Sequence, residues 1–299
     1  MSFNPTVSIV IPVYNGANYL RAAIESALAQ TYGYVEILVV NDGSNDGGKT
    51  EEIALSYGGT LRYLVKENGG VASALNHGIR NMTGEYLSWL SHDDVYYPGK
   101  LERQIGFLRG REDTNIVLYS DFEIFDGNSI SIALHHLDKK ITENPLRAIL
   151  SAAIHGCSTL VPKAAFERMG LFNERLRTVQ DNEMWLRVFQ GGINFVHIPE
   201  ILIKSRVHPE QGQLTLGAIN RLETIQFYNW AFDTLHEEIR KDEGAILEVL
   251  ANKGINLPLG ILRRSSAKSR EFSWQGILGY KVRVYFRKIS RRIVQRRKI

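Results

Sequence analysis

The chain has 299 residues, of which 44% are hydrophobic and 23% charged, with a net charge of +4. This composition excludes a disordered or fibrous protein, and the length suits one large α/β domain or a domain with an appendage. The apolar runs are too short to span a bilayer, and strand-like sequence begins soon after Met1, so we expect no signal peptide. The single cysteine, Cys157, excludes an internal disulfide and favours a reducing compartment. We therefore expect a cytoplasmic protein.

The charge is divided unevenly along the chain. Residues 261–299 contain 13 Lys and Arg and one acid, whereas the other 260 residues contain 23 Lys and Arg and 31 Asp and Glu. Within residues 274–299, apolar side chains recur at near-heptad spacing, at Leu278, Val282, Tyr285, Ile289 and Ile293. This pattern predicts a basic amphipathic helix on an anionic membrane surface, at the inner face of the plasma membrane. The alternative is a helix packed on the protein's own body. We expect no nucleic-acid partner, because no recognition module accompanies the charge.

Strands and helices alternate in the first 110 residues. Buried strands are predicted at 7–12, 36–40, 61–65 and 86–90, and helices at 20–28, 50–57, 71–82 and 100–109. This alternation predicts a mostly parallel sheet with helices on both faces. From residue 116 onward the pattern loosens into shorter strands, with helical segments near 145–153 and 181–189.

A polar, loop-forming cluster follows each of the four strands. The clusters are Tyr14-Asn15-Gly16, Asn41-Asp42-Gly43, Glu67-Asn68-Gly69-Gly70 and Ser91-His92-Asp93-Asp94. Ligands of such sheets bind beyond the carboxyl ends of the strands. We therefore expect all four clusters to converge on one cleft.

The loop at Asp42 resembles the opening of a calcium-binding EF-hand loop. Ser44, Asp46 and Gly47 continue the match, but Ile53 occupies the position of the bidentate glutamate that such a loop needs. The flanking sequence also reads as a strand followed by a helix. An Asp/Gly turn after a strand is the favoured interpretation.

Three further positions carry groups that could do chemistry. Asp93 and its neighbour Asp94 follow a buried strand, where hard oxygen ligands suit Mg²⁺ or Mn²⁺ bridging to a diphosphate, although a solvated turn has the same sequence. Asp181 could act as a general base or cap a helix. His208 could be a metal ligand or a plain strand-end histidine. Cys157 has no assignable partner for nucleophilic catalysis and is interpreted as a small buried residue.

The order of five motifs resembles the family-2 inverting glycosyltransferases, which have the GT-A fold. In one-letter code these motifs are VSIVIPVYN, VVNDGS, ENGGVA, LSHDD and QDNEMWLR, beginning at residues 7, 39, 67, 90 and 180. The resemblance runs from about residue 7 to residue 208. It is specific for the family and much less so for the substrate.

The resemblance implies a donor site for a nucleotide-diphospho-sugar. Pro12, Tyr14 and Asp42 would hold the nucleobase, with Asp42 accepting a hydrogen bond from it. Asn68 and Gly69 would line the nucleotide pocket together with Gly70.

The resemblance also implies the groups around the reacting atoms. Asp93 would bind the Mn²⁺ or Mg²⁺ ion, and His208 would complete the diphosphate–metal site. Asp181 matches the catalytic base, and Trp185 the aromatic residue that follows it. The segment Gly156-Cys157-Ser158 resembles the part of the family that faces the acceptor.

The sequence departs from the family pattern at two positions. Ser91 stands where many members carry the first aspartate of the metal-binding motif, which weakens the assignment of ribose contacts there. Gln180 replaces the glutamate that commonly precedes the base.

These observations lead to one expected function. We expect a GT-A catalytic domain at 1–215 and a helical region with the basic tail at 216–299. The enzyme would transfer a sugar from a nucleotide diphosphate, with UDP favoured, to a hydroxyl of a saccharide or lipid-linked acceptor, in surface polysaccharide or glycolipid synthesis. The alternatives are a catalytically silent GT-A-fold binding module and a nucleotidyltransferase, whose usual glycine-rich phosphate loop is missing after the first strand.

Overall fold

The structure is a computed structural model that describes residues 3–211 and 216–253. The chain divides into two compact units by its internal contacts. The first, here called the α/β unit, contains residues up to 137 and residues 154–217. The second, here called the helical unit, contains residues 138–153 and the chain from residue 218 onward. The helical unit thus contains an internal segment, 138–153, which lies within the range 1–215 expected for the catalytic domain.

The α/β unit is built on a five-stranded sheet with the order β3-β2-β1-β4-β8. Four strands are parallel, namely β1 (Val7–Val13), β2 (Val35–Asn41), β3 (Arg62–Val65) and β4 (Tyr86–Trp89), and the short β8 (Val161–Pro162) is antiparallel. Every residue of β1 is buried, as expected for a Val/Ile-rich strand with helices on both faces. The predicted α/β fold with a mostly parallel sheet is confirmed.

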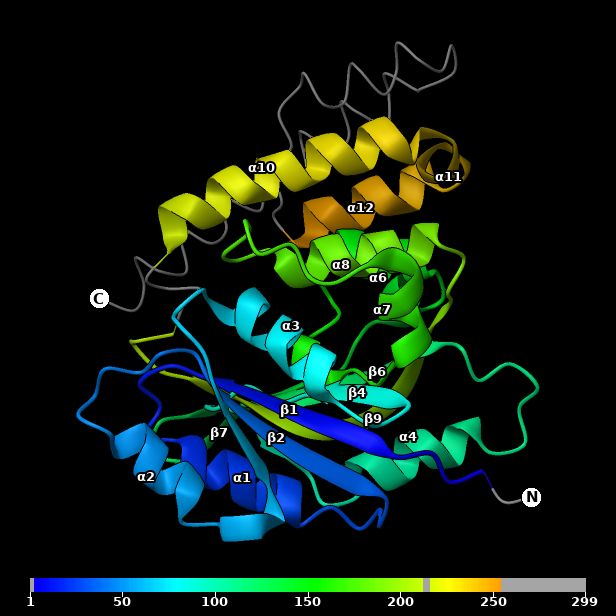
Figure 1. Cartoon of the computed structure of the whole chain (residues 1–299). Helices are drawn as coiled ribbons and strands as arrows, with labels where there is room; N and C mark the ends of the chain where they lie inside the picture. The colour runs from blue at the N-terminus through cyan, green and yellow to red at the C-terminus, as the bar shows by residue number, and fades with distance from the viewer. Residues whose placement is uncertain (1–2, 212–215, 254–299) are drawn as a thin grey trace. The chain divides into compact units, whose positions relative to one another are not determined.

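Helices cover both faces of this sheet (Figure 1). They are α1 (Leu20–Leu28), α2 (Lys49–Leu55), α3 (Val71–Asn81) and α4 (Lys100–Leu108). Helix α3 lies over β1 and β2, and α1 and α2 lie on the opposite face. A Cβ atom on Gly78 of α3 would lie 2.4 Å from Val10 Cγ1, so the close contact of α3 with β1 requires glycine there.

A second sheet in the same unit has the order β5-β9-β6-β7. Its strands are β5 (Val95–Tyr96), β9 (Phe195–Val207), β6 (Val117–Asp126) and β7 (Ser131–His135). The prediction of shorter strands after residue 116 is wrong for β6 and β9, which have 10 and 13 residues. The unit also contains η1 (Gly58–Thr60), the 3₁₀ turn η2 (Gly156–Ser158), α7 (Lys163–Met169) and α8 (Gln180–Gln190).

The helical unit contains α5 (Lys139–Thr142), α6 (Pro145–Leu150), α10 (Gly217–Thr234), α11 (His236–Lys241) and α12 (Glu243–Lys253). Arg147 of α6 donates to Asp242 Oδ1 at 2.6 Å, and Tyr228 of α10 donates to the carbonyl of Leu150. These bonds attach α6 to the later helices. No helix within 3–211 and 216–253 is long and apolar enough to cross a membrane. The predicted basic helix at 274–299 lies outside the described residues.

Candidate functional site

The four polar clusters lie at one edge of the first sheet, because β1 to β4 are parallel and end there. Contacts join the clusters to one another. Asn15 N donates to Ser44 Oγ at 2.9 Å, and Gly70 N donates to Asp42 Oδ2 at 2.7 Å. A Cβ atom on Gly16 would lie 2.6 Å from the His92 ring, so the first cluster also touches the fourth. The predicted convergence of the clusters is therefore found.

The strand order places this convergence at a switch point of the sheet. The chain passes outward from β1 through β2 to β3 and then returns to β4 on the other side of β1. Crevices at such points are where open α/β sheets bind their ligands. The clusters at 14–16 and 91–94 follow β1 and β4 and so flank the crevice.

Asp42 is held by several hydrogen bonds from the loop after β3. Its carboxylate is buried, and Oδ1 accepts from Lys66 Nζ at 2.7 Å and from Gly69 N at 3.0 Å. Oδ2 accepts from Gly70 N at 2.7 Å, and the side chain of Asn68 donates to the Asp42 carbonyl at 3.0 Å. Three of the predicted nucleotide-binding residues, Asp42, Asn68 and Gly69, therefore form one rigid group.

The other two residues predicted to hold the base differ in exposure. The side chain of Tyr14 is 43% exposed, and its hydroxyl lies 3.4 Å from Asn45 Oδ1. Its ring is free to stack on a planar ligand. Pro12 is buried within β1, where it pairs in register with Val40 of β2. Their role in base binding stays a prediction.

Asp93 and His208 meet although 115 positions separate them in sequence. Asp93 Oδ2 lies 3.0 Å from His208 Nε2, and the two side chains are only 12% and 7% exposed. The antiparallel pairing of Val95 in β5 with Lys204 in β9 produces this contact, because it brings residues 93–94 beside 206–208.

The Asp93–His208 pair fits a divalent cation. Bonds of about 2.1 Å at right angles, as in octahedral coordination, place neighbouring ligand atoms about 3 Å apart. The observed separation of 3.0 Å between Asp93 Oδ2 and His208 Nε2 matches that spacing. An ion bound here would take the place of the hydrogen that His208 Nε2 donates to Asp93 Oδ2 in the structure. A carboxylate oxygen and an imidazole nitrogen are both ligands that Mn²⁺ accepts. The two predicted metal ligands are thus in a suitable arrangement.

Asp94 has a different environment from its neighbour. Its carboxyl group is buried, and Oδ1 accepts from the backbone N–H of Arg206 at 2.9 Å. Burial, together with the charge of Asp93, raises the pKa of the Asp94 carboxyl. This carboxyl faces the second sheet and holds the loop in place.

Asp94, His155 and Cys157 also form a cluster whose potential ligand atoms lie within 4.8 Å of one another. His155 Nδ1 accepts the backbone N–H of Cys157 at 3.2 Å, which leaves the ring hydrogen on Nε2, 3.0 Å from Ser205 Oγ. A nitrogen that carries hydrogen is not a ligand, and a thiol is a soft donor that Mg²⁺ and Mn²⁺ disfavour. The cluster is therefore a structural group of hydrogen-bonded side chains.

Ser91 belongs to the same hydrogen-bonded group. Its backbone N–H donates to Cys157 Sγ at 3.2 Å, and the thiol donates to Ser91 Oγ at 3.2 Å. The only cysteine is thus buried, as predicted, and joins the loop after β4 to η2. The contact of Ser91 with ribose stays a prediction.

Asp181 lies in the first turn of α8 and is half-buried. Its Oδ1 accepts from the N–H of Asn182 at 2.8 Å, while Val179 is the residue that precedes the helix. Asp181 is therefore not the N-cap that the alternative interpretation required. Burial raises the pKa of the Asp181 carboxyl to about 6. A carboxyl group with that pKa can accept a proton near neutral pH and release it again.

Aromatic packing fixes α8 next to the end of β4. Trp185 of α8 is fully buried, and its ring centroid lies 6.0 Å from that of Phe172. Phe172 in turn lies 6.2 Å from Trp89, the last residue of β4. The guanidinium of Arg177, just before α8, lies beside Gly70, where a Cβ atom would be 3.3 Å from it. These contacts place the start of α8, whose first turn carries Asp181, near the end of β4 and the Gly69-Gly70 loop.

Two residues of the site were missed by sequence reasoning. Lys66 binds Asp42 and directly precedes the third polar cluster, so its position in the sequence could have indicated that it belongs to the site. Arg206 lies on β9, and His208 directly follows the end of that strand. Residues two apart in an extended chain share a face, so this spacing could have placed Arg206 beside His208.

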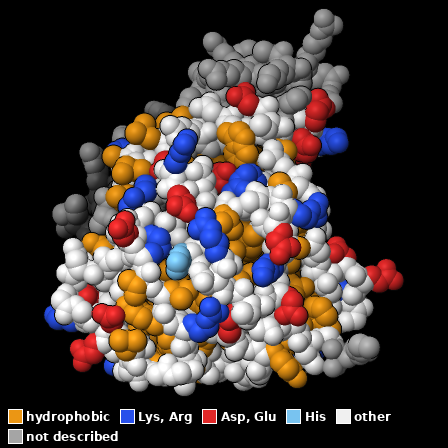
Figure 2. Space-filling view, viewed as in Figure 1, with side chains coloured by type: hydrophobic (Ala, Val, Ile, Leu, Met, Phe, Trp, Pro, Cys, Tyr) orange, Lys and Arg blue, Asp and Glu red, His pale blue; other side chains and the backbone are white. Residues whose placement is uncertain are grey.

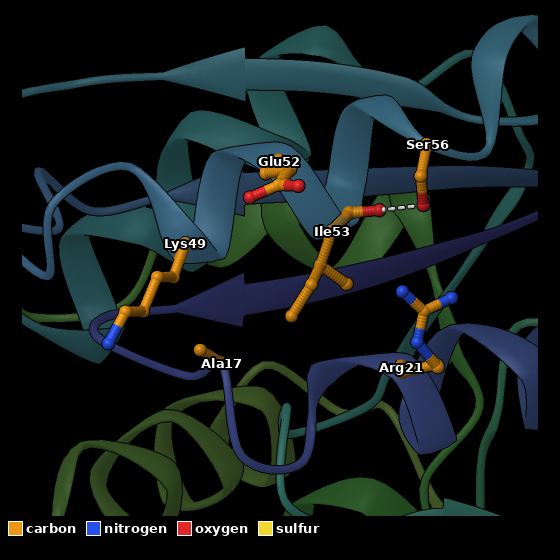
Figure 3. A pocket seen from close by; sticks show the side chains of 6 residues that line it. All are labelled: Ala17, Arg21, Lys49, Glu52, Ile53 and Ser56. Carbon is orange, nitrogen blue, oxygen red and sulfur yellow. Dashed lines mark hydrogen bonds between the residues drawn. The ribbon is translucent and has the colours of Figure 1, made fainter.

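A separate hollow of about 320 Å³ lies between α1 and α2 (Figure 3). It is lined by Ala17, Arg21, Lys49, Glu52, Ile53 and Ser56, none of which is a predicted site residue. Its charged groups, from Arg21, Lys49 and Glu52, are of both signs. Nothing in its lining selects a ligand.

The parallel first sheet, the helices on both of its faces and the crevice at its switch point define an α/β fold of the GT-A type. A crystal structure of Staphylococcus aureus TarS in complex with UDP-GlcNAc is similar in fold, with a TM-score of 0.60 and 15% identity, over 86% of this chain and 83% of that one. The sequence model described as Glycosyl transferase family 2 matches residues 8–170. The chain belongs to glycosyl transferase family 2.

Two curated relatives extend this comparison. An uncharacterized glycosyltransferase of Rickettsia conorii is 46% identical over 248 residues, which cover 81% of this chain and 41% of the relative. The minor teichoic acid biosynthesis protein GgaB of Bacillus subtilis is 29% identical over 191 residues, 61% of this chain and 21% of that protein. The chain therefore spans less than half the length of these relatives.

Proposed function

We propose that this chain is an inverting, metal-dependent glycosyltransferase that moves a sugar from a nucleotide diphosphate to an acceptor hydroxyl. The observation that carries this proposal is the pairing of Asp93 with His208 at 3.0 Å, in the crevice where the nucleotide-side group around Asp42 also lies. A divalent ion held by Asp93 and His208 would neutralise charge on the departing diphosphate.

The other predicted site residues would carry out proton transfer and hold the substrates. Asp181 accepts the proton of the acceptor hydroxyl, whose oxygen attacks the anomeric carbon on the face opposite the diphosphate. The carbon–oxygen bond to the diphosphate breaks as the new glycosidic bond forms, so the anomeric centre is inverted in one step. Asp42 and Tyr14 hold the base, and the crevice orients the two reactants.

UDP is the favoured nucleotide, and a surface polysaccharide or glycolipid is the favoured product. The similarity to a structure of TarS with UDP-GlcNAc and to a teichoic acid biosynthesis protein supports both choices. Purified full-length chain is to be incubated with a panel of UDP-, dTDP- and GDP-sugars and Mn²⁺, because many transferases slowly turn over donor without acceptor. Release of UDP together with a sugar of inverted anomeric configuration, seen by proton NMR, is the expected result. A retained configuration would contradict the inverting mechanism. Formation of UTP and sugar 1-phosphate when pyrophosphate is added to the UDP-sugar would indicate a nucleotidyltransferase.

The pH dependence of the reaction follows from Asp181. Burial raises the pKa of this carboxyl to about 6, and only the deprotonated form can act as a base. We expect kcat/KM to rise with pH through an apparent pKa near 6 and then to level off. The measurement is a pH–rate profile at saturating Mn²⁺. A profile that stays flat between pH 5 and pH 7, roughly one unit either side of that value, would exclude Asp181 as the base.

We also propose that residues 274–299 hold the protein at an anionic membrane surface, which would suit a lipid-linked acceptor. The support is the sequence, because residues 261–299 carry 13 basic side chains and one acid. On the face drawn in Figure 2, by contrast, basic and acidic side chains of the described residues are interspersed. We expect the full chain to pellet with phosphatidylserine vesicles at low salt and much less with neutral vesicles. Equal pelleting with both kinds of vesicle, or with neither, would contradict the proposal.

A further inference from the structure

Arg206 near the end of β9 is a buried cation in contact with two aromatic rings. Its guanidinium carbon lies 4.3 Å from the ring centre of Tyr19 and 4.2 Å from that of Phe125. The residue is only 4% exposed. Two ring contacts at these distances leave a planar guanidinium little freedom to rotate.

The polar atoms of Arg206 bind the loop that carries the metal ligand. Its Nε donates to the carbonyl oxygen of Asp93 at 2.9 Å, and its backbone N–H donates to Asp94 Oδ1 at 2.9 Å. Its Nη1 also donates to the carbonyl of Asp126 at 3.3 Å. Arg206 thus binds both aspartates of the loop. Its side chain binds the backbone of Asp93, and its backbone binds the side chain of Asp94.

No ion pair with another described residue offsets the cost of burying this cation. Among residues 3–211 and 216–253, no carboxylate oxygen lies within 4.0 Å of the Arg206 guanidinium, which is bound by carbonyl oxygens and rings. Packing alone would favour an uncharged side chain at such a position. The carbonyl of Asp93 is a specific target that an apolar side chain could not hold.

The same strand end also provides the second metal ligand. His208 follows Arg206 by two residues, and its ring packs on Tyr19 at 5.0 Å between centroids. Tyr19 therefore contacts both the guanidinium and the imidazole. A shift of Arg206 would move the loop of Asp93 relative to His208, and so change the spacing of the two ligand atoms.

We propose that Arg206 is a positioning residue that sets the separation of Asp93 and His208 and thereby the affinity of the site for a divalent ion. This inference rests on the proposed metal-dependent function. It goes beyond that function because Arg206 acts through the loop and not as a ligand.

The test compares Arg206→Lys with the wild type in the binding of Mn²⁺, followed by the electron paramagnetic resonance signal of free Mn²⁺ in the presence of UDP. Lysine keeps the charge but loses the planar group and the fixed Nε–H. We expect the dissociation constant for Mn²⁺ to rise about 10- to 100-fold, as for other residues that orient metal ligands. We expect the affinity for UDP in EDTA to be unchanged, and kcat at saturating Mn²⁺ to recover.

Two further variants separate positioning from a general loss of structure. Arg103→Lys is the matched control, since Arg103 is an exposed arginine of α4 paired with Glu200, and it should bind Mn²⁺ as the wild type does. Phe125→Leu removes one of the two ring contacts and leaves the hydrogen-bonding groups of Arg206 in place. We expect its affinity for Mn²⁺ to fall about 2- to 30-fold. If Arg206→Lys does not fold, Phe125→Leu provides the test by itself.

The possible outcomes distinguish this inference from the proposed function. A wild-type chain that does not bind Mn²⁺ with UDP would overturn the metal site, and the inference with it. A wild type that binds Mn²⁺ while Arg206→Lys binds it equally well would overturn the inference alone. A variant that loses UDP affinity in EDTA to the same extent as Mn²⁺ affinity would show a general structural role and would also overturn the inference.

Discussion

Asp181→Asn is expected to lower the rate of sugar transfer by a factor of about 10² to 10⁴ while leaving the affinity for UDP nearly unchanged. Asparagine has the size of aspartate but cannot take a proton from the acceptor hydroxyl. The side chain lies in the first turn of α8, and its one described hydrogen bond is to the N–H of Asn182. Transfer is to be measured as UDP release with acceptor present, and UDP affinity by calorimetry.

Glu183→Gln is the matched control for this change. It replaces a carboxylate by an amide two residues further along the same helix, where Glu183 forms an ion pair with Arg187 at 2.8 Å. We expect its transfer rate to stay close to that of the wild type. Full activity in Asp181→Asn, or an equal loss in both variants, would remove Asp181 from the role of base.

Asp93→Ala is expected to abolish the part of nucleotide binding that depends on Mn²⁺. Its carboxylate is one of the two predicted ligands, and its loss leaves His208 without the group 3.0 Å away. The loss of a residue that orients a metal ligand typically lowers metal affinity 10- to 100-fold, and the loss of a ligand itself lowers it further. Calorimetry of UDP with Mn²⁺ and with EDTA separates the two contributions to binding.

In the Asp93→Ala variant, UDP affinity in EDTA should match that of the wild type, because Asp42 and its neighbours are untouched. Asp113→Asn, a change at an exposed aspartate that binds only the nearby N–H of Asn115, is the control and should behave as the wild type. A Mn²⁺-dependent gain in UDP affinity that survives in Asp93→Ala would place the metal elsewhere.

The first sheet could be predicted from sequence because its strands are short apolar runs separated by helical patterns. The second sheet could not, and β6 gives the reason. Asp121 and Glu123 interrupt its apolar pattern, yet both are buried. Asp121 accepts from His197 Nε2 at 2.7 Å, and Glu123 pairs with Lys204 at 3.3 Å. These partners lie on β9, some 80 residues further along. Buried polar residues with distant partners give no local signal of a strand.

The candidate site could be predicted where its residues directly follow strands that the sequence itself predicts. The clusters after β1 to β4 follow from the parallel strands, so their convergence needed no family resemblance. The neighbourhood of Asp93 and His208 depends on the register of β5 with β9, which no pattern within either segment reports. The ring contacts of Arg206 likewise join the residue before α1 to β6 and β9, and only the folded chain brings those together.

On the proposed role of Asp42 as the group that binds the base, we expect the way in which it is held to decide which nucleotides bind. An ionised carboxylate can only accept hydrogen bonds, and Lys66 and two backbone N–H groups keep this one from turning. A base that presents a ring N–H, as uracil, thymine and guanine do, can donate to it. Cytosine presents a lone pair at the corresponding ring nitrogen, and that lone pair would face the negative charge. The crevice would thus discriminate against cytidine nucleotides by repulsion, with no dedicated contact to the base it rejects.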